Sequence, residues 1–306
     1  MQHYWSLDSV QLKDAWITIG SFDGVHLGHQ KIIHKLVAGA HAQGSPALIL
    51  TFDPSPAVVL GKRPEPYYLT TPEERATLLG ELGVDFVVTH PFTHDLASMS
   101  AKDFITNLKS QFGLRYLYVG HDFALGHNRE GDVTFLSQLG EEFDYQVEVI
   151  PPLEITGEVV SSSKIRASLL AGDVKQANKL LGRPYRVKGE VVPGDGRGKT
   201  IGIPTANLSL WSKRAIPKAG VYACKAQVNG INWRAVTNIG VRPTFENRLA
   251  SQRVETHILD FDKDIYGETI YLDFLSYIRA EQRFKDVDAL IQQIQRDITS
   301  SREILG

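Results

Sequence analysis

Two histidines beside two glycines form the strongest chemical signal in the first part of the chain. His26 and His29 are three residues apart, so in a helical turn both side chains lie on one side. Gly24 and Gly28 would let the backbone come close to a ligand at the same place. Two imidazoles there could hydrogen-bond a phosphate and stabilise the charge that grows on it during group transfer.

The position of this segment in the chain supports a phosphate site. Residues 20–29 directly follow the apolar run 15–20 and begin an amphipathic stretch. We therefore expect a helix N-terminus, where unpaired N–H groups and a partial positive charge favour an anion. A metal-binding pair, or two histidines that only cap or fill the core, are the alternatives. No cysteine or evident third ligand accompanies the pair, and the strand end with its two glycines favours the phosphate.

A second group of candidate phosphate ligands follows at residues 161–166. Ser161 and Ser162 stand at the start of an expected helix, where their hydroxyl groups and the backbone N–H groups are donors. Arg166 offers a planar fork that matches phosphate oxygens. Serines at this position are also common helix caps, and the residues alone leave this alternative open.

A glycine-rich stretch in the second half, GDGRGKTIGIPTANL (194–208), ends like a phosphate-binding P-loop at Gly198-Lys199-Thr200. The match fails, because three residues separate Gly194 from Gly198 where the motif needs four. Pro204 also interrupts the helix that must follow such a loop. A flexible glycine loop over phosphates and a plain exposed hairpin loop both remain open.

The pattern of apolar runs predicts the elements that position these residues. In the first half, short apolar runs alternate with amphipathic stretches, which is typical of a doubly wound α/β fold with a parallel sheet. The expected strands are 15–20, 47–52, 85–90, 115–120 and 145–150, and the expected helices are 28–41, 72–81, 100–112, 132–143, 161–171 and 173–181. Ligands on such sheets bind at the carboxyl ends of the strands, which is where residues 20–29 lie.

After residue 184 the pattern changes to strands without helices between them. The expected strands are 185–192, 220–228, 233–240, 254–261 and 269–275. Their spacing predicts a small antiparallel barrel. A last helix is expected to cover one side of the barrel, without a chemical role, through the stripe Val287, Leu290, Ile291, Ile294 and Ile298. We therefore expect two domains, residues 1–183 and residues 184–306.

Composition limits the possible partners. In 306 residues, 33 Lys plus Arg against 35 Asp plus Glu leave a net charge of -2, which gives no general attraction to nucleic acid or to an anionic membrane. The single cysteine, Cys224, cannot form an internal disulfide, which fits a reducing compartment. Without a signal sequence or an apolar run of about 20 residues, we expect a cytoplasmic protein with no membrane contact. A monomer is the default expectation, because no pattern indicates an interface.

Several motifs together resemble a known family of bacterial enzymes. SFDGVHLGH (21–29) is similar to the H-x-G-H signature of the nucleotidylyltransferase superfamily, and Pro-Thr-Ala-Asn (204–207) is similar to a motif of riboflavin kinases. The other matching segments are TFDPSP (51–56), VGHDFALGHNREGD (119–132), VSSSKIRASLLAGDVKQANKLLGRPY (160–185), TNIGVRPTF (237–245) and RVETHILDFDKDIYG (253–267). Over almost its whole length the chain thus resembles the bifunctional riboflavin kinase/FMN adenylyltransferases, also called FAD synthetases.

The resemblance implies a fold and two reactions. A Rossmann-like nucleotidylyltransferase domain, residues 1–183, would transfer the adenylyl group of ATP to FMN, giving FAD and pyrophosphate. A β-barrel kinase domain, residues 184–306, would phosphorylate riboflavin with ATP to give that FMN. The implied partners are these small molecules, and the implied cofactor is Mg²⁺.

In the first domain, the resemblance makes His26 and His29 catalytic residues that contact the phosphates of ATP. The other implied phosphate contacts are Phe22, Asp23, Gly24, Gly28, Ser161, Ser162, Lys164 and Arg166, of which the last four would hold the departing pyrophosphate. Gly120, Asp122 and Phe123 follow an expected strand. Asp122 is expected at nucleotide hydroxyls or magnesium, and Phe123 in a flavin or adenine pocket.

In the second domain, the resemblance assigns Thr205 and Asn207 to magnesium and ATP phosphates, for which a hydroxyl and an amide oxygen are suitable hard ligands. Glu255 aligns with the glutamate that accepts the proton of the riboflavin 5′-hydroxyl. From the residues alone, a solvent-facing carboxylate on a strand is the favoured interpretation of Glu255. The remaining implied ATP or flavin contacts are Gly194, Gly196, Gly198, Lys199 and Arg242.

Two positions depart from the family pattern. Ser21 stands where the family usually has Asn, and Ser55 stands where it usually has His. Ser21 keeps a short hydrogen-bonding side chain, whereas Ser55 lacks an imidazole. Two rival functions therefore stay open, namely a chain with only one of the two activities and a flavin-binding protein without catalysis.

Overall fold

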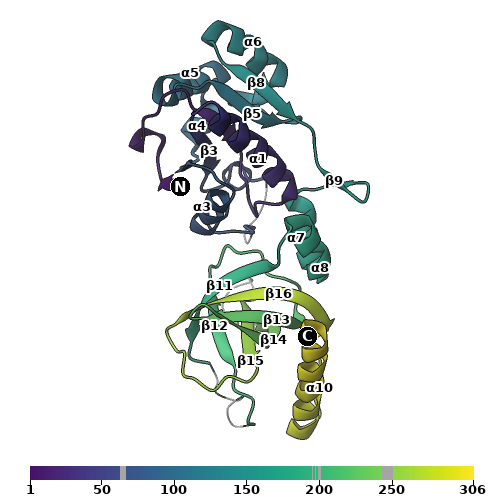
Figure 1. The fold of residues 1–306 in the computed structure, drawn as a ribbon. Helices are drawn as coiled ribbons and strands as arrows, with labels where there is room; N and C mark the ends of the chain where they lie inside the picture. The colour runs from purple at the N-terminus through teal and green to yellow at the C-terminus, as the bar shows by residue number, and fades with distance from the viewer. Residues whose placement is uncertain (63–66, 195, 197, 199–200, 243–250) are drawn as a thin grey trace. The chain divides into compact units, whose positions relative to one another are not determined.

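A computed structural model of the protein describes residues 1–306 except 63–66, 195, 197, 199–200 and 243–250 (Figure 1). The chain divides into two compact units, Met1–Ser162 and Ser163–Gly306. The limits expected from sequence, 1–183 and 184–306, stay a prediction about where the domains part. In the described part of the chain, no helix is both long and apolar enough to cross a membrane.

The first unit is built on a six-stranded parallel sheet with the order β1-β4-β3-β2-β5-β8. Its strands are β1 (Gln2–Tyr4), β2 (Trp16–Ile19), β3 (Ala47–Phe52), β4 (Phe86–His90), β5 (Tyr116–Gly120) and β8 (Gln146–Ile150). Two short hairpins accompany the sheet, β6 (Ala124–Leu125) with β7 (Gly131–Asp132), and β9 (Glu154–Ile155) with β10 (Glu158–Val159). The predicted parallel sheet is confirmed, with the short edge strand β1 in addition.

The helices of this unit follow the strands along the chain. They are η1 (Leu7–Ser9), α1 (Leu27–Ala42), α2 (Pro56–Val59), α3 (Pro72–Glu81), α4 (His94–Ser98), α5 (Ala101–Phe112), η2 (His127–Arg129) and α6 (Val133–Phe143). Side-chain caps fix where several begin: the Thr71 hydroxyl accepts from the Glu74 N–H in a capping box at α3, and Ser100 and Asp132 cap α5 and α6. Such caps stabilise a helix start by about 1 kcal/mol each.

Strand β2 lies in the middle of the core, and its side chains alternate between the two faces of the sheet. Ile17 and Ile19 pack with residues of α5 and α6 such as Leu136. Trp16 packs on the other face with Ile33 of α1. Because both faces are covered, the turn that leaves β2 starts from a fixed position.

The strand order defines where a ligand is expected. Strands β3 and β4 lie on one side of β2, and β5 and β8 lie on the other, so the winding reverses between β2 and β5. In open α/β sheets, ligands bind outside the carboxyl ends of the strands at such a point. Here that place is formed by residues 20–26 after β2 and residues 121–123 after β5.

The second unit contains a closed antiparallel barrel with the order β11-β12-β15-β14-β13-β16. Its strands are β11 (Tyr185–Val192), β12 (Ala206–Leu210), β13 (Gly220–Val228), β14 (Ile231–Arg242), β15 (Ser251–Ile258) and β16 (Thr269–Arg279). Its helices are α7 (Ser162–Ala171), α8 (Val174–Leu181) and α10 (Val287–Leu305), the first of which begins at the last residue of the first unit. The predicted barrel is confirmed, and β12 is a strand that the sequence pattern did not predict.

Helix α10 packs on the barrel, as expected, but its apolar stripe is shorter than predicted. Ile298 packs against the buried cluster of Val221, Val236 and Leu259, whereas Val287 is 55% exposed. The two buried side chains of this helix are polar, Asp297 and Ser301. Each has a partner, since Arg279 pairs with Asp297 at 2.7 Å and Ser301 Oγ donates to the Ala235 carbonyl at 3.1 Å.

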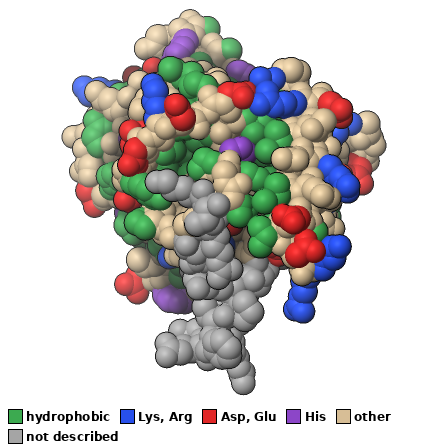
Figure 2. Space-filling view, turned by 90° about the horizontal axis from the view of Figure 1, so that it is seen from below, with side chains coloured by type: hydrophobic (Ala, Val, Ile, Leu, Met, Phe, Trp, Pro, Cys, Tyr) green, Lys and Arg blue, Asp and Glu red, His purple; other side chains and the backbone are tan. Residues whose placement is uncertain are grey.

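The surface agrees with the small net charge. Figure 2 shows one face of the molecule, on which acidic and basic side chains are interspersed around hydrophobic ones. A surface with both signs mixed does not concentrate polyanions by a general field. Any phosphate must be held by local groups.

Candidate active sites

The turn between β2 and α1 is strained and firmly held. Phe22, Gly24 and Val25 have φ angles of 44°, 82° and 41°, and such values in side-chain-bearing residues cost about 1–3 kcal/mol each. The Asp23 carboxylate, which is buried, accepts hydrogen bonds from the backbone N–H of Leu69 at 2.9 Å and of Thr70 at 3.1 Å. These bonds fasten the turn to the segment before α3. Any contact of Asp23 with ATP stays a prediction.

His26 and His29 lie together at the start of α1. His26 is the N-cap residue, and its Nδ1 accepts from the His29 backbone N–H at 3.3 Å. Because Nδ1 accepts, the neutral ring carries its proton on Nε2. The two rings are stacked with centroids 3.6 Å apart. A Cβ on Gly28 would lie 3.1 Å from the His26 ring, so glycine leaves room for this ring orientation.

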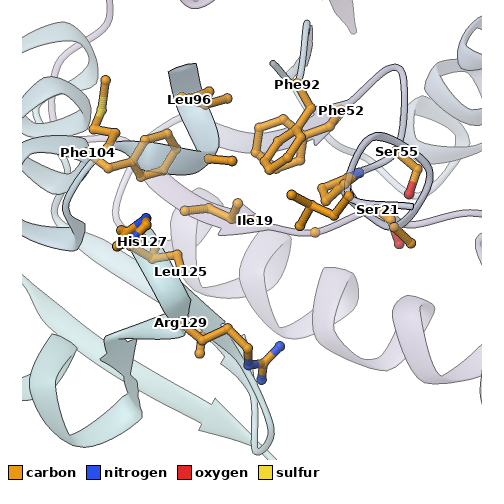
Figure 3. Close-up of a pocket in the computed structure, with 18 of the residues that line it drawn as sticks. Ile19, Ser21, Phe52, Ser55, Phe92, Leu96, Phe104, Leu125, His127 and Arg129 are labelled. Atoms are coloured by element: carbon orange, nitrogen blue, oxygen red, sulfur yellow. The ribbon is translucent and has the colours of Figure 1, made fainter. Parts of the chain in front are cut away.

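A cavity of about 780 Å³ opens at the carboxyl ends of the strands. Its apolar walls come from several elements, as Figure 3 shows for Ile19, Phe52, Phe92, Leu96, Phe104 and Leu125. Ser21 and Ser55 lie toward one end, and Arg129 approaches from the η2 segment. The volume and the mixture of apolar walls with a few polar groups are typical of a small-molecule site.

The predicted site residues at the end of β5 and just after it differ in whether they line the cavity. Phe123 lines this cavity, and its role in a flavin or adenine pocket stays a prediction. Gly120 ends β5, and the Asp122 side chain is 84% exposed. The Asp122 carbonyl accepts a hydrogen bond from Arg129 at 2.8 Å. Arg129 is a cavity residue that sequence reasoning missed, because nothing in its spacing distinguishes it from a surface arginine.

The serine-rich segment contacts the strained turn directly through Ser162. Ser162 Oγ donates to the Asp23 carbonyl at 2.9 Å. Ser161 immediately precedes α7, and Lys164 and Arg166 lie on that helix within the second unit. The predicted phosphate role of these four residues stays a prediction.

In the barrel, the structure brings most of the predicted kinase residues together. A cavity of about 320 Å³ is lined by Gly196, Gly198, Thr205, Asn207 and Glu255. Asn207 of β12 lies opposite Glu255 of β15, and Asn238 of β14 lies opposite Glu255 on the other side. The amide and carboxylate groups therefore form a row across three strands, and all three residues line this cavity.

Two glycines allow the loop before β12 to pack directly on this row. A Cβ on Gly194 would collide with the Asn207 amide, and a Cβ on Gly198 would collide with the Ile203 carbonyl and lie 3.1 Å from Thr205 Oγ1. Their lack of a side chain is thus a packing requirement. Lys199 lies outside the described residues, and so does the side chain of Arg242, whose backbone ends β14.

The donor set of this cavity suits a magnesium ion that is held chiefly by substrate. Among the residues that the structure describes, no three His, Cys, Asp or Glu side chains gather into a metal site. Thr205 and Asn207 offer a neutral hydroxyl and a neutral amide oxygen beside one carboxylate, Glu255. Mg²⁺ commonly takes few protein ligands and completes its shell with phosphate oxygens and water. The residues present therefore fit such an ion.

Comparisons with known proteins cover both units. A model described as FAD synthetase matches residues 8–164, and a model described as riboflavin kinase matches residues 181–305. The bifunctional riboflavin kinase/FMN adenylyltransferase of Listeria monocytogenes is 37% identical over 287 residues, which is 94% of this chain and 91% of the relative. That of Bacillus subtilis is 38% identical over 285 residues, which is 92% of this chain and 89% of the relative.

The chain belongs to the family of bifunctional riboflavin kinase/FMN adenylyltransferases. A crystal structure from Streptococcus pneumoniae, named a macrolide-efflux protein, is also similar, with a TM-score of 0.89 and 31% identity over 98% of each chain. The two reactions of the family produce FAD from riboflavin. The resemblance seen in the sequence motifs is confirmed.

A buried arginine of the FAD synthetase part was missed by sequence reasoning. Arg75 of α3 is 1% exposed, and its guanidinium donates to the Ser21 carbonyl at 2.7 Å and to the Phe52 carbonyl at 3.2 Å. It thereby ties the ends of β2 and β3 together. Burial lowers the pKa of Arg75 from its ordinary value, while Asp23 and Asp53 nearby act in the opposite direction. In the sequence, Arg75 looks like one more charge on an amphipathic helix.

The riboflavin kinase part uses α10 more than its sequence suggested. Leu290, Ile294 and Asp297 of this helix line the cavity that holds Glu255. Asp297 accepts both bonds of the Arg279 fork, at 2.9 and 2.7 Å, and Arg279 lines the same cavity. The apolar periodicity of the sequence did not indicate a buried polar contact in this helix, because an aspartate counts as polar and interrupts the apolar pattern.

A further cavity of about 370 Å³ lies next to the Pro-Thr-Ala-Asn motif. It is lined by Ala206, Ile258, Phe261, Asp262 and Tyr266, together with Thr205. Thr205 lines the cavity of Glu255 as well. Among the described lining residues, Thr205 is therefore the one that both cavities have in common.

Proposed function

We propose that the chain makes FAD in two steps, each in its own part of the molecule. Residues 184–306 convert riboflavin and ATP to FMN and ADP, and residues 1–183 convert FMN and ATP to FAD and pyrophosphate. The observation that carries this proposal is that each unit has its own cavity lined by, or next to, the matching motif residues.

For the kinase step, we assign riboflavin to the cavity of Glu255 and the nucleotide to the neighbouring cavity. The apolar walls of the first, with Phe284, Leu290 and Ile294, suit a flavin ring, and Phe261 and Ile258 of the second suit an adenine. Because Thr205 is common to both, the γ-phosphate reaches the riboflavin hydroxyl beside this residue. The two rings then need not overlap.

The chemistry of this step needs one proton acceptor. Glu255 accepts the proton of the riboflavin 5′-hydroxyl while the 5′-oxygen forms a bond to the γ-phosphorus. The bond between that phosphorus and the β,γ-bridging oxygen breaks, and ADP is released. Thr205 and Asn207 would hold Mg²⁺, which neutralises charge on the phosphates when bound. The glycines at 194, 196 and 198 let the loop come close to the phosphates, and Lys199 and Arg242 are expected to contribute positive charge there.

For the adenylyl step, we assign FMN to the large cavity of the first unit, with Phe123 in its wall and Gly120 and Asp122 toward the nucleotide. An FMN phosphate oxygen attacks the α-phosphorus of ATP, and the bond to the departing pyrophosphate breaks. His26 and His29, with backbone N–H groups at the start of α1, stabilise the charge on the phosphates. Ser161, Ser162, Lys164 and Arg166 would hold the pyrophosphate. No protein nucleophile is required, so positioning supplies much of the rate.

The function is tested by incubating the full chain with riboflavin, ATP and Mg²⁺ and separating the flavins by chromatography. The proposal expects FMN to appear first and FAD to follow. Accumulation of FMN without FAD would support a kinase with an inactive first domain. Flavin bound to the protein without release of ADP or pyrophosphate would support a binding protein, and the proposal would then be wrong.

A further inference from the structure

One arginine contacts both groups that the kinase step is expected to use. The Arg253 Nε–H donates to Asn207 Oδ1 at 2.9 Å, and the same Nε lies 2.7 Å from Glu255 Oε1. Arg253 also lines the cavity that contains them. A single guanidinium thus bridges the expected proton acceptor and an expected magnesium ligand.

The strand geometry explains why the three side chains meet. Arg253 and Glu255 are two residues apart on β15, so they project from the same face. Asn207 lies opposite Glu255 on the neighbouring strand β12. The side chains of Arg253 and Glu255 are each 29% exposed, and Asn207 is buried. The contact therefore lies within the cavity and is less screened than a surface pair.

Arg253 uses the atom of Asn207 that a metal would need. An arginine can only donate, so the atom that accepts from it must be the amide oxygen Oδ1. A hard divalent cation binds through the same oxygen, because the amide nitrogen offers only donors. A guanidinium and a divalent cation at one oxygen repel each other at this distance. The guanidinium takes one of the two lone pairs of Oδ1, and a cation on the other lone pair is repelled by it.

We propose that Arg253 competes with the divalent cation for Asn207, and so sets the cation concentration that the kinase site requires. Binding of the cation with ATP moves the guanidinium away from Oδ1. This inference rests on the proposed function of the barrel site. Arg253 is a positioning residue, since it acts on the cation through Asn207.

The direction in which cation affinity changes distinguishes competition from two other roles of Arg253, namely phosphate binding and stabilisation of the barrel. If Arg253 held the phosphates of ATP, or merely stabilised the barrel, its removal would weaken cation binding or leave it unchanged. Competition predicts the opposite, namely tighter binding after removal. Arg253→Met retains much of the side-chain length without the charge, and Arg253→Gln is a second uncharged variant should the first fold poorly.

The experiment is a titration of the full chain with Mn²⁺ as the probe in the presence of ADP. Electron paramagnetic resonance measures the Mn²⁺ bound by the protein as the difference from an ADP solution without protein. Arg253→Met and Arg253→Gln are each expected to lower the dissociation constant by about threefold or more. In an Asn207→Ala background, neither substitution should change it. Arg234→Met is the matched control. Arg234 lies on the neighbouring strand β14, pairs with Asp260 at 3.6 Å and is not part of the cavity lining.

The outcomes separate the inference from the function on which it rests. Unchanged or weaker Mn²⁺ binding in Arg253→Met, or an equal gain without Asn207, would overturn the inference even if riboflavin is phosphorylated. A wild-type chain that forms no FMN would overturn the proposed function, whatever the titration shows. If both the inference and the proposed function are correct, the Mg²⁺ concentration for half-maximal FMN formation falls in Arg253→Met. The Mg²⁺ concentration for half-maximal FAD formation from FMN does not change.

Discussion

Gly194→Ala tests most directly whether the glycine loop and Asn207 belong to one site. A Cβ at residue 194 would lie 2.8 Å from Asn207 Oδ1 and closer still to its Cγ and Nδ2. The nearest amide atom, Nδ2, lies 2.0 Å from this Cβ, so an ordinary contact of 3.4 Å requires the carboxamide to move by about 1.4 Å. A displacement of about 1 Å near reacting groups can already cost about 100-fold in rate. That factor corresponds to about 2.7 kcal/mol of transition-state stabilisation.

The assay measures initial rates of FMN formation from riboflavin and FAD formation from FMN on the same purified protein. We expect FMN formation to fall about 100-fold while FAD formation is unchanged, because the first unit does not contain residue 194. Gly230→Ala is the control, since Gly230 has a φ of 80° and no atom within 4 Å of its added Cβ. This substitution strains the backbone of a turn, and the added Cβ collides with no other atom. A Gly194→Ala protein with wild-type FMN formation would refute the argument.

Three further outcomes are expected. His29→Ala should lower FAD formation from FMN by about 100-fold or more, through loss of charge stabilisation, while FMN formation continues; normal FAD formation would remove the histidine from the mechanism. Glu255→Gln should lower FMN formation by about 100-fold or more and spare FAD formation, and a fully active variant would exclude this carboxylate as the base. Burial raises the pKa of the Cys224 thiol, so the folded protein should keep this group protonated above the ordinary thiol pKa and react with a disulfide reagent only on unfolding; rapid labelling of the native chain would contradict the buried position.

The sequence predicted those parts of the fold and sites that depend on local pattern. The β2-to-α1 turn could be located because glycines and histidines at fixed spacing follow an apolar run, and the stacked pair His26 and His29 is observed there. Glu255 could be located only through the family motif, since its alternation along a strand favours a solvent-facing carboxylate. The structure adds that this strand face is turned into a cavity.

What the sequence did not predict depends on contacts between distant segments. Strand β1 has three residues and β12 follows directly after Pro204-Thr205, so neither gives a periodic signal of useful length. Arg75 binds a backbone carbonyl of a distant segment, and Arg253 binds the side-chain amide of Asn207 on another strand. The burial of both arginines depends on how these segments pack together, which the sequence of one segment does not show. Asp297 interrupts an apolar stripe and yet is buried, because Arg279 satisfies it.

The shared position of Thr205 has a kinetic consequence. This side chain belongs to the walls of two cavities. Under the assignment proposed above, both substrates of the kinase step are bound at once, and their reacting atoms meet beside Thr205. Transfer is then direct, and no phosphorylated form of the enzyme is needed as a carrier. Under the same assignment, a larger side chain at residue 205 would keep the two reacting groups apart while each substrate still binds in its own cavity.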